Sequence, residues 1–361
     1  MENRFTLLVD SNWLLQSHFS LVQNKFLINN SEQAKKAAQR DLSDFMARSI
    51  NVIINRFRSI DNIVIVADGG SWRKNYKKPT TLQNVVYKGN RENNQDYDWD
   101  YIWGALDDII FASSKLGLTT CRAVGIEGDD WIYQWSRRLN KASVNCIIWS
   151  SDCDLKQLVQ VDDVTRAFTV WYNDKNGVVI PEKLQDNTID DLEFFFKPQP
   201  DSMILEDLKR RCKKHSYINP DSIALEKFIC GDAGDNIMSI VKYEKNGRNY
   251  GVGPKDCEKI LNELNITSIQ NYLDNRSNIA DWILNNKKYK DINMSKEQII
   301  ERIDYNIRMV WLNEYSIPQV ITDCMLKEKY KKFDISYIRS NYRCLIGDES
   351  EEDIKNLFES M

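Results

Sequence analysis

Three short apolar stretches, each followed by an aspartate, decide the fold of this chain. They are FTLLVD at residues 5–10, IVIVAD at residues 63–68 and CIIWSSD at residues 146–152. Continuous apolar runs of this length are typical of strands that are buried on both faces of a parallel sheet. Between the first two stretches, apolar residues from Leu42 to Phe57 recur at spacings of mostly three and four, which predicts a long helix. Strand, helix and strand in this order predict a parallel βαβ unit and an α/β fold.

Functional groups are expected at one edge of this sheet. In open parallel sheets, such groups gather beyond the carboxyl ends of the strands. Asp10, Asp68 and Asp152 each follow an apolar stretch, so their side chains should converge there. A second helix is predicted to begin at Asp129 and Asp130, because acidic residues in a first turn suit the helix dipole.

The second half of the chain has a different pattern. Two further strands are predicted at residues 164–171 and 178–180, on either side of a turn rich in Asn, Asp and Gly. Three prolines punctuate residues 198–220, and beyond them the pattern is mostly helical to about residue 332. The first half is therefore expected to supply the sheet and the second half a helical region.

Composition excludes several classes of protein. Of the 361 residues, 42% are hydrophobic and 28% charged, with 14 Gly and 7 Pro, which excludes collagen-like, low-complexity and wholly disordered chains. No apolar stretch of about 18 residues is present, so no membrane span is expected. Eight cysteines without C-x-x-C spacing, and only two histidines, argue against structural zinc and a disulfide framework. Reduced thiols in a cytoplasmic protein are the expectation.

Basic residues are concentrated beside one of the aspartates. The net charge is −4, from 49 basic and 53 acidic residues, so the sum alone does not indicate a nucleic-acid-binding protein. Residues 69–91 nevertheless contain no Asp or Glu and carry six bases: Arg73, Lys74, Lys77, Lys78, Lys88 and Arg91. A basic loop is often simply solvated, but this one directly follows Asp68, which favours contacts with phosphates.

The acids form a candidate metal site. Nine are considered together: Asp10, Asp68, Glu127, Asp129, Asp130, Asp152, Asp154, Asp232 and Asp235. Each alone could be a helix cap or a surface residue, but so many carboxylates near strand ends would repel one another unless cations were bound. Oxygen ligands with few His or thiolate groups select Mg²⁺ or Mn²⁺ over Zn²⁺. Two such ions suit the hydrolysis of a phosphodiester, because one can activate water and the other can stabilise the leaving oxygen.

Local spacing suggests how some of these acids are presented. Asp152 and Asp154 alternate along a predicted extended loop and should therefore point to one side. Asp232 and Asp235 are three residues apart, which would place them on one face of a helical turn. Both pairs are expected to face the same site.

The motifs together resemble those of the 5′ nucleases, the family of flap endonucleases and 5′–3′ exonucleases. DCDLKQL at residues 152–158 is similar to the family's D-x-D-[LF]-x-Q-L, and IEGDD at residues 126–130 to its E-A-[DN]-D. GDAGDN at residues 231–236 resembles G-D-x-x-D-N, and YKGNR at residues 87–91 resembles Y-K-x-x-R. WRK at residues 72–74 is similar to the W-R-R of the ribonucleases H of T-even bacteriophages, the branch that the chain resembles most.

This resemblance implies an architecture. It implies an α/β nuclease core with a mainly parallel sheet over residues 1–200, including a helical arch within residues 69–100. A helical, helix-hairpin-helix-like DNA-binding region is expected over residues 201–332, and a C-terminal tail over residues 333–361. Two departures from the family pattern are visible: residues 237–250 separate GDAGDN from the expected hairpin, and residues 77–84 are inserted in the arch region.

The resemblance also implies roles for individual residues. The first metal would match Asp10, Asp68 and Asp129, with Glu127 reaching it through water. The second would match Asp152, Asp154 and Asp235, while Asp130 and Asp232 match outer-shell positions. Lys88 and Arg91 match residues that steer the scissile phosphate. Arg73 and Lys74 are the next candidates for this role. Lys77 and Lys78 are expected to bind DNA. Gly251, Gly253 and Lys255 would bind a phosphate, and K⁺ could bind there; alternatively, this segment is an ordinary turn.

The implied function is a metal-dependent 5′–3′ exonuclease and flap endonuclease, acting on 5′ ends of DNA and of RNA primers on DNA. Its partners would be branched or nicked duplex DNA and RNA–DNA hybrid. It would use two Mg²⁺ ions, for which Mn²⁺ could substitute. Its role would be lagging-strand primer removal in a phage-infected bacterial cell. A monomer is expected. One alternative is a phosphohydrolase with an Asp nucleophile, which would need a second acid where Asn12 stands. The other is a branched-DNA-binding module without catalysis, against which the complete set of acids argues.

The end of the chain suggests a protein partner. An acidic run from residue 348 is followed by an apolar cluster of Ile354, Leu357 and Phe358 at helical spacing. Such a cluster can dock into a groove of a partner, and a replication nuclease would gain local concentration from tethering. The expectation is a sliding clamp or a single-strand-binding protein; the alternative is that the cluster packs on this same chain.

Overall fold

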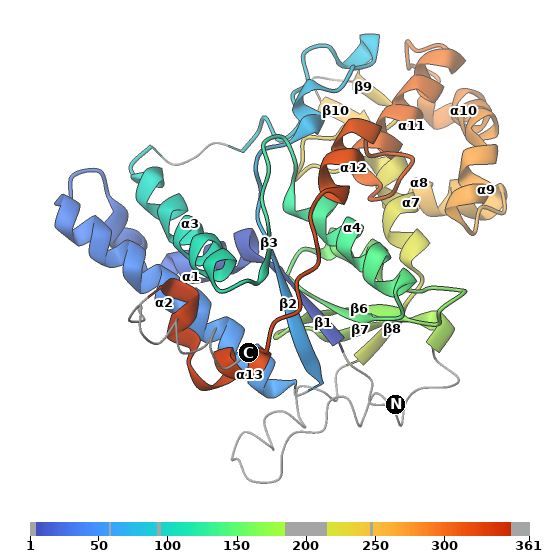
Figure 1. The fold of residues 1–361 in the computed structure, drawn as a ribbon. Coiled ribbons are helices and arrows are strands. Elements are labelled where there is room, and N and C mark those ends of the chain that lie inside the picture. The colour runs from blue at the N-terminus through green and yellow to red at the C-terminus, as the bar shows by residue number, and fades with distance from the viewer. Residues whose placement is uncertain (1–4, 58, 92–94, 185–214, 246–247, 348–361) are drawn as a thin grey trace.

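The computed structural model describes residues 5–57, 59–91, 95–184, 215–245 and 248–347 (Figure 1). Within these residues an eight-stranded sheet has the order β3-β2-β1-β4-β6-β7-β8, with β5 paired to β6. Its strands are β1 (Phe5–Asp10), β2 (Ile60–Val66), β3 (Thr119–Cys121), β4 (Asn145–Trp149), β5 (Gln160–Val161), β6 (Phe168–Asn173), β7 (Gly177–Pro181) and β8 (His215–Ile218). The pairs formed by β5 and by β7 with β6 are antiparallel and the others are parallel, so the predicted mainly parallel sheet is confirmed.

The helices account for most of the remaining described residues. The α-helices are α1 (Ser11–Val22), α2 (Glu32–Arg56), α3 (Trp99–Lys115), α4 (Gly128–Lys141), α7 (Pro220–Cys230), α8 (Pro254–Glu263), α9 (Ile269–Asp274), α10 (Arg276–Asn285), α11 (Lys296–Val310), α12 (Gln319–Leu326) and α13 (Ile335–Ser340). Short 3₁₀ turns are η1 (Gln23–Phe26), η2 (Trp72–Asn75), η3 (Thr80–Leu82), η4 (Cys153–Leu158), η5 (Glu182–Leu184), η6 (Lys287–Tyr289) and η7 (Tyr342–Ile346). Among the described residues, none of the helices is long and apolar enough to cross a membrane.

Both faces of the sheet are covered, which explains the continuous apolar strands. Alternate residues of a strand point to opposite faces. Phe5, Leu7 and Val9 of β1 pack in a core with α2 and α3, whereas Leu8 packs in a second core with residues of α4. Figure 1 shows α1, α2 and α3 on one side of the sheet and α4 on the other. This arrangement brings the carboxyl ends of β1, β2 and β4 to one edge.

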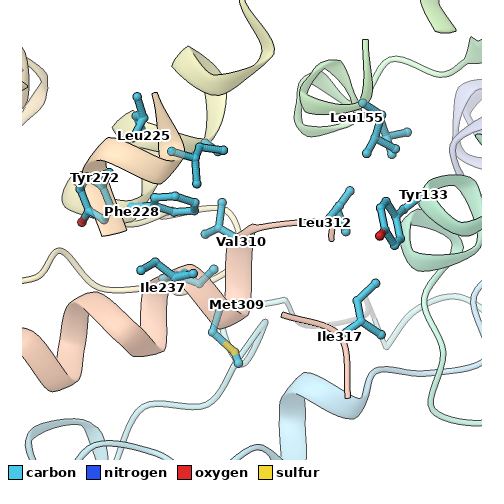
Figure 2. Close-up of a cluster of buried hydrophobic side chains, with 14 of the residues drawn as sticks. Tyr133, Leu155, Leu225, Phe228, Ile237, Tyr272, Met309, Val310, Leu312 and Ile317 are labelled. Atoms are coloured by element: carbon cyan, nitrogen blue, oxygen red, sulfur yellow. The ribbon is translucent and has the colours of Figure 1, made fainter. Parts of the chain in front are cut away.

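The helical region shares a core with the sheet. The end of α11 supplies Val310 and the segment after it supplies Leu312, and both are buried in the same cluster as Trp131 of α4 and Phe228 of α7. Figure 2 shows Val310 and Leu312 between Phe228 on one side and Tyr133 on the other. Packing of this kind fixes the helical region against the α/β core.

The predicted region boundaries need two corrections. Residues 201–332 are expected to be helical, but β8 joins the central sheet beside β7, and β9 (Lys242–Lys245) forms an antiparallel hairpin with β10 (Arg248–Gly251). Residues 333–347 are expected in the tail, but α13 and η7 pack on α2 and α3, with Ile338 and Leu345 fully buried. These apolar residues close the core that α2 and α3 leave open. The predicted partner-binding segment 354–361 lies outside the described residues.

The segment expected as a helical arch also differs. Residues 69–91 contain only η2 and η3, and the next α-helix begins at Trp99. Pro79 and the left-handed backbone of Lys88, with φ of 54°, are incompatible with a continuous helix. Instead, the Lys88 amide donates to the Asp235 carbonyl at 2.8 Å, which ties this segment to the loop that carries Asp232 and Asp235.

Candidate active site

Three strand ends place their aspartates together, as the sequence predicts. Asp10 is the last residue of β1 and caps α1, where its Oδ1 accepts a hydrogen bond from the Trp13 amide at 3.0 Å. Asp68 lies two residues beyond β2, and its Oδ1 accepts from the Gly128 amide at the start of α4 at 2.6 Å. The helix N-terminus therefore orients a carboxylate from a neighbouring strand.

Ser150 joins two of these acids, a role that sequence reasoning did not assign. Its hydroxyl donates to Asp10 Oδ2 at 2.6 Å and accepts from the Asp152 amide at 2.9 Å. Its position in the sequence could have indicated this role, because Ser150 is the first residue after β4 and precedes Asp152 by two residues. Ser150 thus fixes the relative positions of the β1 and β4 ends.

Four acids, which we call the unpaired acids, make no ion pair with any described base: Asp10, Asp68, Asp129 and Asp152. Burial, with smaller contributions from the nearby Asp68 and Asp152, raises the pKa of Asp10 to about 6, although the hydrogen bonds from Ser150 and Trp13 oppose the shift. Burial likewise raises the pKa of Asp68.

Asp129 lies in the first turn of α4, near the other three unpaired acids. Burial, followed by repulsion from Asp152, Asp10 and Asp68, raises its pKa well above the ordinary range, and only Lys88 opposes the shift. A proton or a cation is therefore strongly favoured beside Asp129.

Five other acids, which we call the paired acids, each contact a basic side chain: Glu127, Asp130, Asp154, Asp232 and Asp235. Arg73 is at the centre of the most buried pairing. Its guanidinium donates to Glu127 Oε2 at 2.6 Å, to Asp130 Oδ1 at 2.9 Å and to the Met309 carbonyl at 3.0 Å. The Arg73 residue is only 2% exposed and Asp130 is fully buried. Arg73, predicted as a phosphate-contacting residue, is therefore a buried positioning residue, and Asp130 faces it instead of the unpaired acids.

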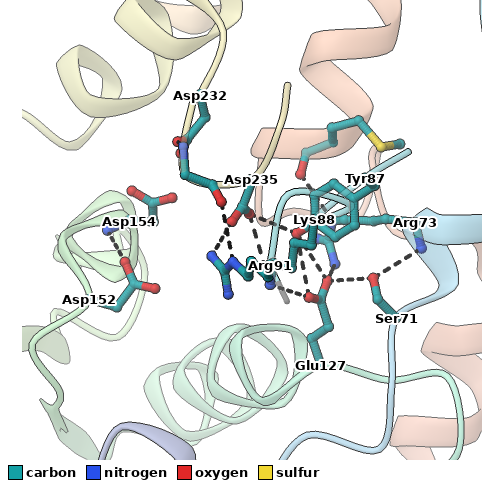
Figure 3. A network of polar contacts seen from close by, with 12 residues as sticks. Ser71, Arg73, Tyr87, Lys88, Arg91, Glu127, Asp152, Asp154, Asp232 and Asp235 are labelled. Carbon is teal, nitrogen blue, oxygen red and sulfur yellow. Dashed lines mark hydrogen bonds and ion pairs between the residues drawn. The ribbon is translucent and has the colours of Figure 1, made fainter. Parts of the chain in front are cut away.

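Lys88 and Arg91 reach the site from the basic segment, as predicted. Lys88 Nζ lies 2.5 Å from Glu127 Oε1 and 3.9 Å from Asp235 Oδ2, while Arg91 pairs with Asp235 Oδ1 (Figure 3). The Tyr87 hydroxyl donates to Asp235 Oδ2 at 2.9 Å. Burial would raise the pKa of Glu127, but Arg73 and Lys88 outweigh it and lower that pKa to about 2.

Lys227 is a further site residue that sequence reasoning missed. It extends from α7, and its ammonium bonds both Asp154 and Asp232. Burial of the ammonium would lower the pKa of Lys227, but the attraction of the two carboxylates is larger and raises this pKa. The signal in the sequence is only its place five residues before Asp232.

Two local predictions about the acids are wrong in detail. Asp232 and Asp235 do not lie on a helical turn: they lie in a loop that is closed by a bridge between Asp232 and Ile237. Gly231 opens this loop with φ of +75°, and a Cβ there would lie 2.3 Å from the Ile237 carbonyl oxygen, so only glycine fits. Asp152 and Asp154 do not alternate along an extended loop, because Asp152 caps η4 and accepts from the Asp154 amide at 2.8 Å.

The remaining predicted residues lie around the rim. Lys74 and Lys77 are exposed and Lys78 is half-buried, and none of them makes an ion pair within the part of the chain that the structure describes. Gly251 ends β10, Gly253 caps α8 and Lys255 is exposed in its first turn. These residues lie outside the cluster of acids.

The chemistry of the donor set fits divalent cations. Glu127, Asp129, Asp154, Asp232 and Asp235 line a cavity of about 20 Å³, close to the volume that holds one water. As the described side chains stand, no three acidic, His or Cys residues are close enough together to hold an ion. The bases Lys88, Arg91 and Lys227 occupy carboxylate oxygens that a metal would need, so ion uptake requires some of these pairs to open.

Comparison with known proteins agrees with this picture. Residues 5–188 match the sequence model of a family described as 5′-3′ exonuclease, N-terminal resolvase-like domain. The chain is 24% identical over 297 residues to a 5′-3′ exonuclease of Buchnera aphidicola subsp. Acyrthosiphon pisum (strain APS), which covers 82% of this chain and 85% of that protein. It is 25% identical over 256 residues to a 5′-3′ exonuclease of Mycoplasmopsis pulmonis (strain UAB CTIP), which covers 70% and 71%.

Solved structures show the same fold. T5 5′-exonuclease with divalent zinc ions bound superposes with a TM-score of 0.51 at 15% identity, covering 98% of this chain and 99% of that one. Bacteriophage T5 flap endonuclease, in a pseudo-enzyme-product complex with DNA and metal ions, gives a TM-score of 0.51 at 16% identity, covering 96% and 100%. The predicted fold class is therefore supported over nearly the whole chain.

Proposed function

The chain belongs to the 5′–3′ exonuclease family of hydrolases, and from this premise we propose that it hydrolyses phosphodiesters at 5′ ends and 5′ flaps of duplex DNA. The observation that carries the proposal is the group of unpaired acids, which lie beyond the ends of neighbouring strands and, for Asp129, at the start of α4. Such a concentration of uncompensated carboxylates is unfavourable for folding alone, and it suits a site that takes up cations.

Two Mg²⁺ ions, or Mn²⁺ in their place, are the proposed cofactors. Asp10, Asp68 and Asp129 would hold one ion, with Glu127 acting through water. Asp152, Asp154 and Asp235 would hold the other. Bound ions would supply activated water and charge stabilisation for an in-line displacement.

The chain's own bases complete the site. Lys88 and Arg91 pair with Glu127 and Asp235 and would turn to the scissile phosphate when a substrate and ions displace them. Arg73 remains buried and holds Glu127 and Asp130 in place. Lys74, Lys77 and Lys78, on the rim, would contact phosphates further along the strand.

The segment from Gly251 to Lys255 is proposed to bind the backbone of the duplex. Gly253 caps α8; Pro254 has no N–H and the Asp256 and Cys257 amides donate to the Gly253 carbonyl, so the Lys255 amide is the first-turn donor that would face a phosphate, and K⁺ could bind beside it. The β9–β10 hairpin directly precedes this cap and accounts for the residues that separate it from GDAGDN.

The finer parts of the function are proposals as well. We propose that the substrates include branched or nicked DNA and RNA primers on DNA, that the role is lagging-strand primer removal in a phage-infected cell, and that the enzyme acts as a cytoplasmic monomer. The similarity of WRK at residues 72–74 supports a relation to the ribonucleases H of T-even phages. A sliding clamp or a single-strand-binding protein is the proposed protein partner.

A cleavage assay tests the central proposal. A duplex with a labelled 5′ flap is incubated with the full chain in EDTA, Mg²⁺ or Mn²⁺, and short labelled products should appear only with metal. Binding without cleavage would instead indicate a DNA-binding module. Release of inorganic phosphate from small esters would indicate a phosphohydrolase, a reading already disfavoured because Asn12 Oδ1 accepts from the Asp68 amide at 2.8 Å and so has a structural role.

A further inference from the structure

A second cavity lies next to the site, between the basic segment and the helical region. Its volume is about 290 Å³, near the lower end of the range for small-molecule pockets, roughly 300–1,000 Å³. One wall comes from the residues after η2, including Tyr76 and Lys77, and the other from α11 and the loop beyond it, including Tyr305, Arg308 and Tyr315. In Figure 1 the segment after β2 runs up to the helical region near α11. Its first wall includes part of the insertion at residues 77–84.

Three tyrosine rings line this pocket. The Tyr76 and Tyr305 rings are 6.4 Å apart, and Tyr305 is 5% exposed. Tyr315 is 45% exposed, and the Arg308 guanidinium lies 4.2 Å from its ring centroid. An exposed tyrosine backed by an arginine is a platform on which a planar, electron-rich ring can stack.

The charges around the rings suit one nucleotide. Lys77 and Lys78 line the pocket and make no ion pair with any described acid, so they are available to a phosphate. Asp304 is already paired with Arg276. Glu301 makes no side-chain hydrogen bond within the described residues, and its carboxylate can accept one from an exocyclic amino group of a base.

The pocket is joined to the site through Arg73. Tyr76 follows Arg73 by three residues and donates its amide hydrogen to the Arg73 carbonyl at 3.3 Å. Arg308 directly precedes Met309, whose carbonyl accepts from Arg73 at 3.0 Å. Because Arg73 also holds Glu127, the pocket lies next to the acids, separated from them by one side chain.

We propose that this pocket binds one unpaired nucleotide of the substrate's flap strand. The base stacks on Tyr315 and contacts Tyr76, Lys77 holds the adjoining phosphate, and Glu301 accepts from the base edge. The proposal rests on the proposed nuclease function and specifies where that enzyme holds the single strand.

An abasic scan of the flap tests the proposal. Flaps in which one nucleotide at a time lacks its base are cleaved by the full chain in Mg²⁺, and KM and kcat are measured. At one position the missing base should raise KM roughly tenfold with little change in kcat, the size expected for one lost stacking contact. Tyr315→Ala should raise KM for the complete flap by a similar factor, and the missing base should then cost the variant nothing more.

Three controls make the result specific. Tyr315→Phe keeps the ring and should retain the wild-type KM. Phe111→Ala removes another exposed aromatic residue, on α3, and should have no effect. A recessed 5′ end without unpaired nucleotides should be cleaved equally well by wild type and Tyr315→Ala, and melting temperatures verify that the variants fold.

The outcomes separate this inference from the function on which it rests. A wild-type chain that cleaves no substrate in Mg²⁺ overturns the proposed function. Cleavage with a flat abasic scan, or an equal loss for Tyr315→Ala on recessed ends, overturns the pocket assignment alone. If Tyr315→Ala changes only inhibition by free dCMP while the scan stays flat, the pocket takes released mononucleotides and the flap assignment is wrong.

Discussion

The unpaired and the paired acids occupy the same edge of the sheet but differ in what balances their charge. Glu127, Asp154 and Asp235 are held by the chain's own lysines and arginines before any ion arrives. Asp10 and Asp129 have no such partner, and burial together with like charge raises the pKa of both. The unpaired acids therefore depend on a proton or a metal for relief, whereas the paired acids are fixed in advance. Asp154 is intermediate between the two groups, because burial and the nearby Asp152 raise its pKa although Lys227 pairs with it.

The largest effect is expected from Asp152, an unpaired acid that we propose as a metal ligand. Asp152→Asn should lower kcat on a 5′-labelled flap by about a thousandfold or more, because a neutral amide is a poor ligand for a hard cation. DNA binding, measured by fluorescence anisotropy, should persist. Ordinary turnover by this variant in Mg²⁺ would remove Asp152 from the metal site.

Stability should respond in opposite directions to the loss of charge in the two groups. Asp130→Asn weakens a buried pair with Arg73 and should lower the free energy of unfolding by about 3 kcal/mol. Asp129→Asn removes a repelled carboxylate and should raise it by about 1 kcal/mol in EDTA. Denaturant unfolding measures both. The same sign for both variants would abolish the distinction between the groups.

The stability of the metal-free protein should depend on pH, because the pKa values of two site aspartates are raised. The pKa of Asp10 and that of Asp154 are both raised from 3.8 to about 6, chiefly by burial. The stability contributed by their protonated forms is complete below about pH 4 and is lost as the pH rises through 6. Metal-free protein should therefore gain roughly 2 kcal/mol between pH 7 and pH 5, and apparent Mg²⁺ affinity should fall over the same interval. A metal-free stability that is flat from pH 7 to pH 5 would contradict this.

Lys227 gives a smaller and more selective test. Lys227→Met removes the cation between Asp154 and Asp232 and should cost about 1 kcal/mol in EDTA, with a smaller loss in Mg²⁺ because ions can take over part of the neutralisation. The matched control is Lys259→Met, which removes an exposed pair with Glu263 and should change little. Equal losses with and without Mg²⁺ would make Lys227 a purely structural residue.

The smallest effect is expected at the helical region. Gly253→Glu places a carboxylate at the cap of α8, where an added Cβ meets no atom within 4 Å, so the fold should tolerate it. Binding to flaps with long duplex arms should weaken about threefold through repulsion of the phosphate. Asn262→Glu, at the far end of α8, controls for charge alone. Unchanged affinity at low salt for Gly253→Glu would indicate a plain turn.

The parts of the fold that depend on local pattern could be predicted from the sequence. The apolar runs before Asp10, Asp68 and Asp152 predict parallel strands, and strand direction alone brings their ends together. Predictions were less successful where contacts between distant segments determine the environment of a side chain. From the sequence, a basic residue in a loop is predicted to contact a phosphate. Only the fold shows that Arg73 is buried between Glu127 and Asp130. Lys227 carries no motif, so its two acidic partners become visible only in three dimensions.

The order of elements along the chain has a consequence for how the protein is made. α13 and η7, close to the end of the described chain, are buried against α2 and α3, and the Asn51 side chain donates to the Ile338 carbonyl at 2.7 Å. While the ribosome is still synthesising the helical region, the nascent nuclease core therefore lacks part of its cover. The apolar side chains of α2 and α3 that α13 and η7 cover must stay exposed, or be shielded by a chaperone, until residue 347 has left the exit tunnel. The newly made chain is expected to complete this core only after α13 and η7 have been synthesised.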